Sequence, residues 1–94
     1  MKLESIKKSD RKGKKYVATF TNGKTKSVHF GATGYEDFTT HKDSKRRELY
    51  LKRHKKNESW NEPTTASSLS RHLLWGQSTS LKKNIQSFKK KFNL

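Results

Sequence analysis

The sequence contains no cysteine. This absence excludes disulfide bonds and thiolate metal sites, and it suits a reducing compartment or a particle assembled in one. No apolar run approaches the roughly 20 residues that span a bilayer, and the first ten residues, "MKLESIKKSD", lack the apolar stretch of a signal peptide. We therefore expect a soluble protein that has no membrane partner and is made inside the cell.

Acidic and hydrophobic residues are also scarce. Eight Asp+Glu face 23 Lys+Arg, which gives a formal net charge of +15, and hydrophobic residues make up only 28% of the chain. This composition is typical of disorder, but an aromatic content of 11% and the periodic placement of the apolar residues predict a thin, real core. We expect one small basic domain over residues 1–94, in which residues 1–14 form either an edge strand or a flexible basic arm and residues 15–94 form the folded core.

Motifs for catalysis and for metal binding are absent as well. The sequence has no G-x-x-x-x-G-K-[ST] loop, no nucleophile elbow and no paired carboxylates in an apolar setting. Its four histidines, His29, His41, His54 and His72, do not have the spacing of a zinc site. We therefore predict that the protein is not an enzyme and has no catalytic residue, no metal site and no cofactor.

Two β-forming segments are predicted near the N-terminus. Residues 16–21, "YVATFT", and 25–31, "TKSVHFG", flank an NGK turn. We favour a three-residue loop, with Gly23 left-handed and Phe20 paired with Lys24, over a two-residue loop of the other parity. Only the three-residue loop places the apolar residues on one face: Tyr16, Ala18, Phe20, Val28 and Phe30. The segment from Leu3 to Lys8 is expected to add an edge strand.

A loop and a basic helix are predicted next. Tyr35 and Phe38 are expected to anchor the loop to the core. Asp43 or Ser44 is expected to cap a helix that runs to about Asn57. Its inward positions are predicted to be Leu49, Tyr50 and Arg53 or His54.

Two further helices complete the predicted fold. The first ends at Gly76, interpreted as a C-terminal cap, and its apolar residues are Ala66, Leu69, Leu73 and Leu74. The second is capped within Ser78–Ser80, and its apolar residues step by four, three and four: Leu81, Ile85, Phe88 and Phe92. The predicted fold class is α+β, a small N-terminal antiparallel β-hairpin or meander followed by three α-helices.

Positive charge is concentrated in three blocks, at residues 1–15, 41–56 and 63–94. Such surfaces bind nucleic acid through its phosphates, whatever its base sequence. Because the excess of Lys and Arg recurs in three blocks, we favour binding over a merely solvated helix face. An acidic protein surface could bind these blocks for the same electrostatic reason. Most aromatic residues are expected in the core rather than as stacking platforms for single strands. The predicted nucleic-acid-binding residues are Lys42, Lys45, Arg46, Arg47, Lys52, Arg53, Lys55, Lys56, Arg71, Lys82, Lys83, Lys89 and Lys90.

Short motifs follow one another in a fixed order between Lys15 and Phe92. They are His29-Phe30-Gly31, Gly34-Tyr35, Asp37-Phe38-Thr39, His41-Lys42-Asp43, Arg53-His54, Trp60, Thr65-Ala66, Leu69-Ser70-Arg71 and Leu73-Leu74-Trp75. This series resembles a family of short uncharacterised basic proteins encoded by nucleocytoplasmic large DNA viruses, of the algal-virus and mimivirus kind. The resemblance implies a viral setting rather than an activity. The polar residues between strand and helix are interpreted as structural caps, with a contact surface as the alternative: Asp37, Thr39, His41, Lys42 and Asp43.

Charge and resemblance together predict a non-enzymatic viral protein that binds polyanions. We expect sequence-independent binding of nucleic acid, with DNA favoured over RNA, linked to genome packaging or to the virion. The alternative is a minor capsid protein that binds acidic surfaces of larger shell proteins. Either function places the protein in the virion and in the cytoplasm or nucleus of the infected host cell, and the oligomeric state stays open.

Overall fold

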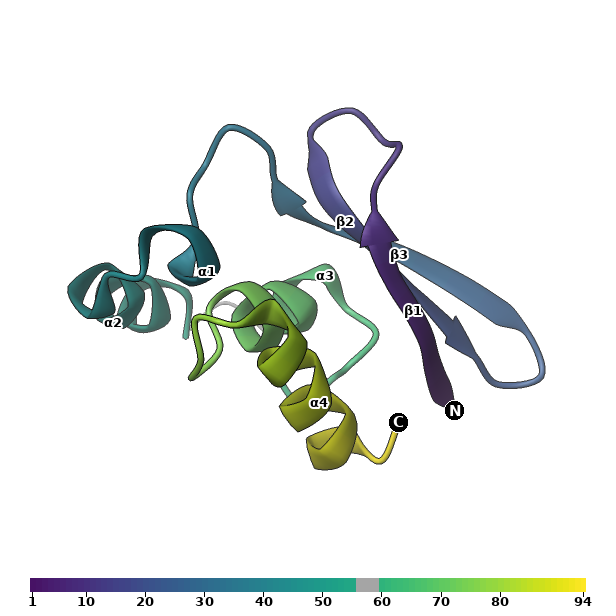
Figure 1. Cartoon of the computed structure of the whole chain (residues 1–94). Coiled ribbons are helices and arrows are strands. Elements are labelled where there is room, and N and C mark those ends of the chain that lie inside the picture. The colour runs from purple at the N-terminus through teal and green to yellow at the C-terminus, as the bar shows by residue number, and fades with distance from the viewer. Residues whose placement is uncertain (56–59) are drawn as a thin grey trace.

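A computed structural model describes residues 1–55 and 60–94 of the chain (Figure 1). The strands β1 (Lys2–Lys8), β2 (Lys14–Thr21) and β3 (Thr25–Ala32) form an antiparallel sheet in the order β1-β2-β3. The elements that follow are α1 (Phe38–His41), α2 (Ser44–His54), α3 (Ala66–Leu69), the π-helical segment η1 (Ser70–Leu74) and α4 (Leu81–Phe92). The α+β prediction is confirmed, with four α-helices in the described ranges where three were expected. Lys56 and the predicted extension of the basic helix to Asn57 lie outside the described residues.

The N-terminal segment forms an edge strand of the sheet. β1 pairs with β2 from Lys2–Thr21 to Lys8–Tyr16. The register shifts between Leu3 and Ser5, and this bulge inserts one extra residue into β1. Because of the bulge, Leu3 and Ile6 both reach the core although they are three residues apart.

The β2–β3 hairpin has the predicted faces but a different register. Phe20 pairs with Lys26 rather than with Lys24, and the loop consists of Asn22, Gly23 and Lys24. Gly23 has the predicted positive φ, at 75°. A shift by two residues leaves the alternation of side chains unchanged. The predicted inner face is therefore confirmed: Tyr16, Ala18, Phe20, Val28 and Phe30.

The segments α3, η1 and α4 lie next to the sheet (Figure 1) and bury the core against it. Phe20 and Phe30 project from the sheet, with 1% and 0% of their surface exposed. Leu69, Leu73 and Phe88 meet them from the last two predicted helices. The prediction that the hairpin and the last two helices make the core is therefore confirmed, except at Ala66, which is exposed.

The helix formed by α3 and η1 ends differently from the prediction. The φ of Gly76 lies outside the left-handed region, so Gly76 is not the expected cap. A Cβ at this position would lie 2.4 Å from the His72 carbonyl oxygen and 2.7 Å from Asn84 Cγ. Glycine is therefore required here because two segments approach closely.

Asn84 fixes α4 against the end of η1. Its side chain is 3% exposed, and its Nδ2 donates to the carbonyl oxygens of Leu73 at 2.9 Å and Ser78 at 2.8 Å. Its Oδ1 accepts from the Ser78 amide at 3.1 Å. The apolar periodicity that predicts α4 does not reveal this polar position on its buried face.

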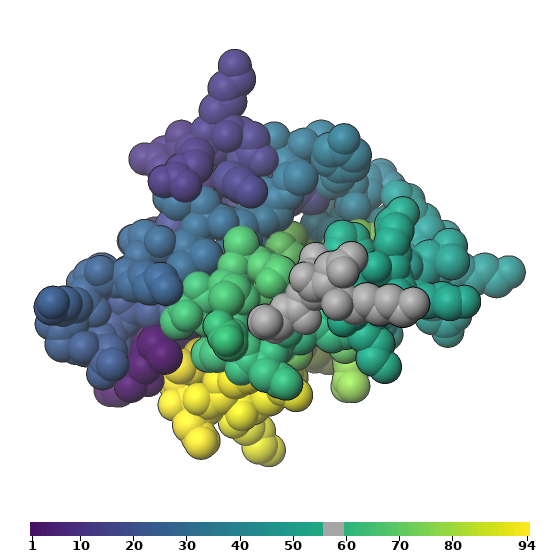
Figure 2. All heavy atoms as spheres, turned by 180° about the vertical axis from the view of Figure 1, so that it is seen from behind, coloured from purple at the N-terminus to yellow at the C-terminus, as the bar shows by residue number. Residues whose placement is uncertain are grey.

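The helix α2 lies at one end of the molecule, and the tip of the β2–β3 hairpin lies at the other (Figure 1). The view from behind shows the same separation (Figure 2). Tyr50 and Phe38 are buried as predicted, with 8% and 7% exposed. Leu49 and Tyr35 are not: they are 62% and 75% exposed, so the prediction that both face the core is wrong. α2 approaches the core through a single stripe centred on Tyr50, which leaves its neighbour Leu49 off that stripe.

Candidate nucleic-acid interface

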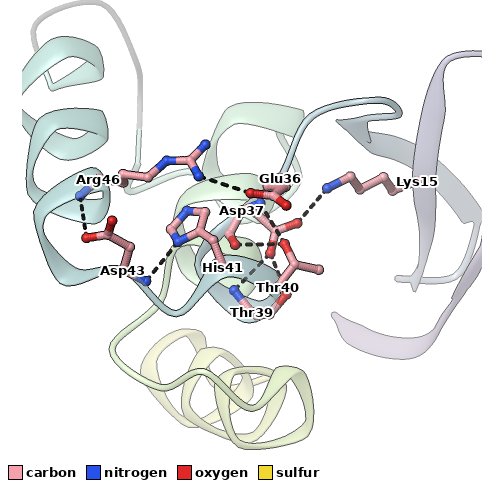
Figure 3. A network of polar contacts seen from close by, with 8 residues as sticks. All are labelled: Lys15, Glu36, Asp37, Thr39, Thr40, His41, Asp43 and Arg46. Carbon is pink, nitrogen blue, oxygen red and sulfur yellow. Dashed lines mark hydrogen bonds and ion pairs between the residues drawn. The ribbon is translucent and has the colours of Figure 1, made fainter.

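A network of polar contacts shapes the loop between β3 and α2 (Figure 3). Asp37 is 3% exposed and forms a 2.7 Å ion pair with Lys15 of β2. Its Oδ1 accepts from the amide and from the hydroxyl of Thr39, and its own amide donates to Thr40 Oγ1 at 2.9 Å. These bonds cap α1 and satisfy the buried carboxylate. The loop is thereby tied to the sheet.

A second cap starts α2 immediately afterwards. The Asp43 Oδ1 accepts from the amides of Lys45 at 3.0 Å and Arg46 at 3.3 Å, and the Asp43 amide donates to His41 Nδ1 at 2.8 Å. Lys42 joins α1 to α2 in the left-handed conformation, with φ of 59°. The cap interpretation is confirmed for Asp37, Thr39, His41 and Asp43.

Four exposed cations form what we call the basic face of α2: Lys45, Arg46, Lys52 and Arg53. Lys42 and Lys55 flank this face and are exposed too. Within the described residues, Arg46 is the one member with an ion-pair partner, Glu36 Oε2 at 3.0 Å. Both side chains of that pair are about half exposed or more, at 49% and 62%, so the pair contributes only about 0–1 kcal/mol. The face therefore keeps most of its positive charge uncompensated.

Arg47 does not lie with the other cations of α2. Its side chain is half-buried, and its Nε donates to the carbonyl oxygens of Trp75 at 3.2 Å and Gly76 at 2.9 Å. Its guanidinium carbon also lies 5.6 Å from the centre of the Phe38 ring. Arg47 therefore fastens α2 to the end of η1.

Arg71 has a similar structural position. Its Nη1 donates to the Trp75 carbonyl oxygen at 3.1 Å, and its guanidinium carbon lies 5.2 Å from the centre of the Trp60 ring. Burial lowers the pKa of Arg71 from its ordinary value, and the adjacent Arg47 charge lowers it further, against a smaller raising effect of Tyr50. Two guanidinium groups thus converge on the carbonyl oxygens that follow η1, where a helix leaves acceptors unsatisfied.

Replacing Arg47 with methionine is expected to lower the free energy of unfolding by about 1.5–3 kcal/mol, because hydrogen bonds from a charged donor are lost. Chemical denaturation would measure the change. Lys45→Met, two residues away and exposed, is the matched control and should stay within about 0.5 kcal/mol of the wild type. If Arg47→Met were as stable as the wild type but bound nucleic acid more weakly, Arg47 would be a binding residue, as the sequence predicts, rather than a structural one.

An open cavity of about 500 Å³, which we call the α2 cavity, lies between α2, the end of β3 and η1. In its wall, Tyr50 stacks on Trp75 with ring centres 4.2 Å apart and an angle of 2°, and on His54 with centres 4.3 Å apart. The exposed Tyr35 and Leu49 both line this cavity. Cations and carboxylates line it as well: Lys15, Arg46, Arg53, Glu36 and Asp37. The cavity thus joins apolar walls to the basic face of α2.

A second cavity lies beside α4, and Lys83 is the one predicted lysine of that helix among its lining residues. Lys82, Lys83, Lys89 and Lys90 are exposed, and a cavity of about 470 Å³ between η1 and α4 is lined by Lys83, Lys91, Arg71 and His72 among others. Burial lowers the pKa of His72, against the raising effect of its hydrogen bond with the Trp60 carbonyl oxygen. The neutral imidazole is therefore favoured, and the positive charge here comes from the lysines and Arg71.

Within residues 1–55 and 60–94, no helix is both long and apolar enough to cross a membrane. The same residues contain no group of three or more histidine, aspartate or glutamate side chains that could hold a metal ion.

A comparison with known protein families gives a match over the N-terminal part of the chain. Residues 4–54 match a family described as a family of unknown function. The matched stretch runs from β1 to the end of α2, so it contains the sheet, the capped loop and the basic face of α2. No curated protein and no solved structure matches the chain.

Proposed function

The chain belongs to the family of unknown function DUF5754, and from its own surface we propose that it binds nucleic acid through the phosphate backbone, without catalysis. The observation that carries the proposal is the basic face of α2. Lys45, Lys52 and Arg53 are exposed on one helix of 11 residues, and none has an ion-pair partner among the described residues. A polyanion is the partner that this arrangement suits best.

Binding of phosphates would relieve the repulsion within the protein. A net charge of +15 on 94 residues weakens the compact state, and neutralised phosphates release condensed counterions, which drives association. The position of α2 at one end of the molecule leaves its basic face accessible to a long polymer (Figure 1). Exposed lysines on α4 supply a second set of phosphate contacts: Lys82, Lys83, Lys89 and Lys90.

The proposed partner is DNA rather than RNA, and the proposed setting is a viral genome or virion. The viral setting follows from the resemblance of the sequence motifs to basic proteins of large DNA viruses. Binding is expected to be independent of base sequence, because long exposed lysines make phosphate contacts that carry no sequence information. An acidic surface of a larger shell protein is the competing partner, and the experiments must separate the two.

Titration with duplex DNA at several salt concentrations tests the proposal. If four to six phosphates are contacted, a plot of log affinity against log salt should have a slope of about −4 to −5. The 94-residue chain and a fluorescent 20-base-pair duplex are sufficient for this measurement. Absence of binding at low salt, with retained binding of poly-glutamate, would favour the acidic shell protein. Recovery with the stripped shell rather than with the genome, after fractionation of purified virions, would also count against a packaging role.

A further inference from the structure

We propose that the α2 cavity takes an unpaired base of single-stranded nucleic acid while the backbone of the same strand lies on the basic face of α2. The inference rests on the proposed function and deepens it, because it names single strands as the preferred form. The observation behind it is that two large apolar side chains, Tyr35 and Leu49, are exposed at the same cavity.

Tyr35 and Leu49 are exposed although the chain has few apolar residues to spare. Among the described residues, the large exposed hydrophobic side chains are Met1, Tyr35 and Leu49. Tyr35 comes from the loop after β3 and Leu49 from α2, yet both line the same cavity. Exposed apolar side chains that gather at a hollow are typical of a binding site. The volume of the α2 cavity, about 500 Å³, also lies within the range of about 300–1,000 Å³ that is typical of ligand pockets.

The polar groups of the cavity favour a neutral base over a phosphate. Asp37 is buried and lines the cavity, and its carboxylate already holds Lys15 at 2.7 Å. The Asp37 charge is neutralised by Lys15, so this buried pair offers a phosphate no free cation. A base carries no charge, so it can lie against the Asp37–Lys15 pair without a counter-charge of its own.

The rim of the cavity provides for the phosphates. Arg46 and Arg53 line the cavity and also belong to the basic face of α2. Arg46 reaches across to Glu36 at 3.0 Å, as Figure 3 shows. This exposed pair is weak, so a phosphate can replace Glu36 as the partner of Arg46. The cavity can therefore bind the base of a nucleotide while the adjacent Arg46 and Arg53 bind its phosphate.

A duplex cannot use this arrangement, because its base faces are covered by their neighbours. A single strand can, and stacking on an aromatic ring is tolerant of base identity. The preference for single strands would thus be compatible with binding that is independent of base sequence.

Three fluorescent probes of 12 nucleotides test the inference with the 94-residue chain: a single strand, the same strand with abasic sites, and the duplex. The intact strand should bind about five- to fiftyfold more tightly than the abasic strand, because stacking is lost in the latter. Tyr35→Ala and Leu49→Ala should remove most of this difference and leave the affinity for the abasic strand unchanged. Tyr35→Phe keeps the ring and should behave as the wild type. Thermal melting checks that each variant is folded, as their exposure leads us to expect.

These measurements distinguish failure of the base site from failure of nucleic-acid binding as a whole. Equal affinity for intact and abasic strands would overturn the base site and leave phosphate binding intact. No binding of any probe at low salt would overturn the proposed function itself. Binding of poly-glutamate that Tyr35→Ala abolishes, with no effect of Tyr35→Ala on the intact strand, would overturn the base site and assign the cavity to an acidic protein segment.

Discussion

Replacing Phe88 with alanine is expected to lower the free energy of unfolding by about 3–5 kcal/mol, the usual effect of truncating a large buried ring. Phe88 is 1% exposed and belongs to the core cluster that joins the sheet to the helices. Its ring centre lies 5.7 Å from that of His72 and 5.1 Å from that of Phe92. Since a domain is stable by only about 5–15 kcal/mol, and this core is thin, the loss would bring the protein close to unfolding. Chemical denaturation, followed by circular dichroism, measures it.

The matched control for Phe88→Ala is Lys89→Ala. Lys89 is the next residue of α4 and is exposed, so its truncation should change the free energy of unfolding by no more than about 0.5 kcal/mol. At temperatures where Phe88→Ala is still folded, this variant should bind duplex DNA with the affinity of the wild type, because Phe88 is buried. If Phe88→Ala had the denaturation midpoint of the wild type, Phe88 would not hold the core together.

Local spacing is enough to predict the elements that build the core. The alternation in residues 16–31 fixes the inner face of the hairpin even though the predicted pairing is shifted by two residues, because side-chain direction depends only on parity. The step of four, three and four in Leu81–Phe92 likewise predicts α4. Both patterns are carried by neighbours in the sequence, so no knowledge of the tertiary structure is required.

Contacts between distant segments are what the sequence does not reveal. Arg47 in α2 donates to carbonyl oxygens of Trp75 and Gly76, which are 28 and 29 residues away. In the sequence Arg47 is indistinguishable from Arg46, and only the docking of α2 separates the inward guanidinium from the outward one. Gly76 shows a related limit: glycine is needed there because a Cβ would clash with the His72 carbonyl oxygen and with Asn84, not because of a left-handed turn.

One part of the candidate site can be predicted from the sequence and the other cannot. The exposed cations are predictable from composition and from the run of charge in residues 41–56. The α2 cavity is not, because its walls come from segments as far apart as Lys15 and Trp75. Tyr35 and Leu49 were expected in the core because apolar residues usually are, and their exposure became a signal only once both were placed at one hollow.

Replacing Arg46 and Arg53 together with glutamate is expected to weaken binding of duplex DNA by roughly ten- to a hundredfold at low salt, because phosphate contacts are lost and repulsion is added. The slope of log affinity against log salt should become shallower by about 2, one for each lost phosphate contact. Both side chains are exposed, and Arg46 has only a weak surface pair with Glu36. The free energy of unfolding should therefore change by less than about 1 kcal/mol. Anisotropy titrations and thermal melting measure the two effects separately.

Net charge alone would also lower the affinity, so the control must change the charge by the same amount elsewhere. Lys24 and Lys26 serve this purpose because both are exposed at the β2–β3 hairpin, at the end of the molecule opposite α2 (Figure 1). Lys24→Glu with Lys26→Glu should weaken binding only severalfold and leave the salt slope nearly unchanged, since few phosphates are contacted there. An equal loss in both double variants would mean that the overall field attracts the polymer without a defined interface. A loss confined to Arg46→Glu with Arg53→Glu would place the phosphates on the basic face of α2.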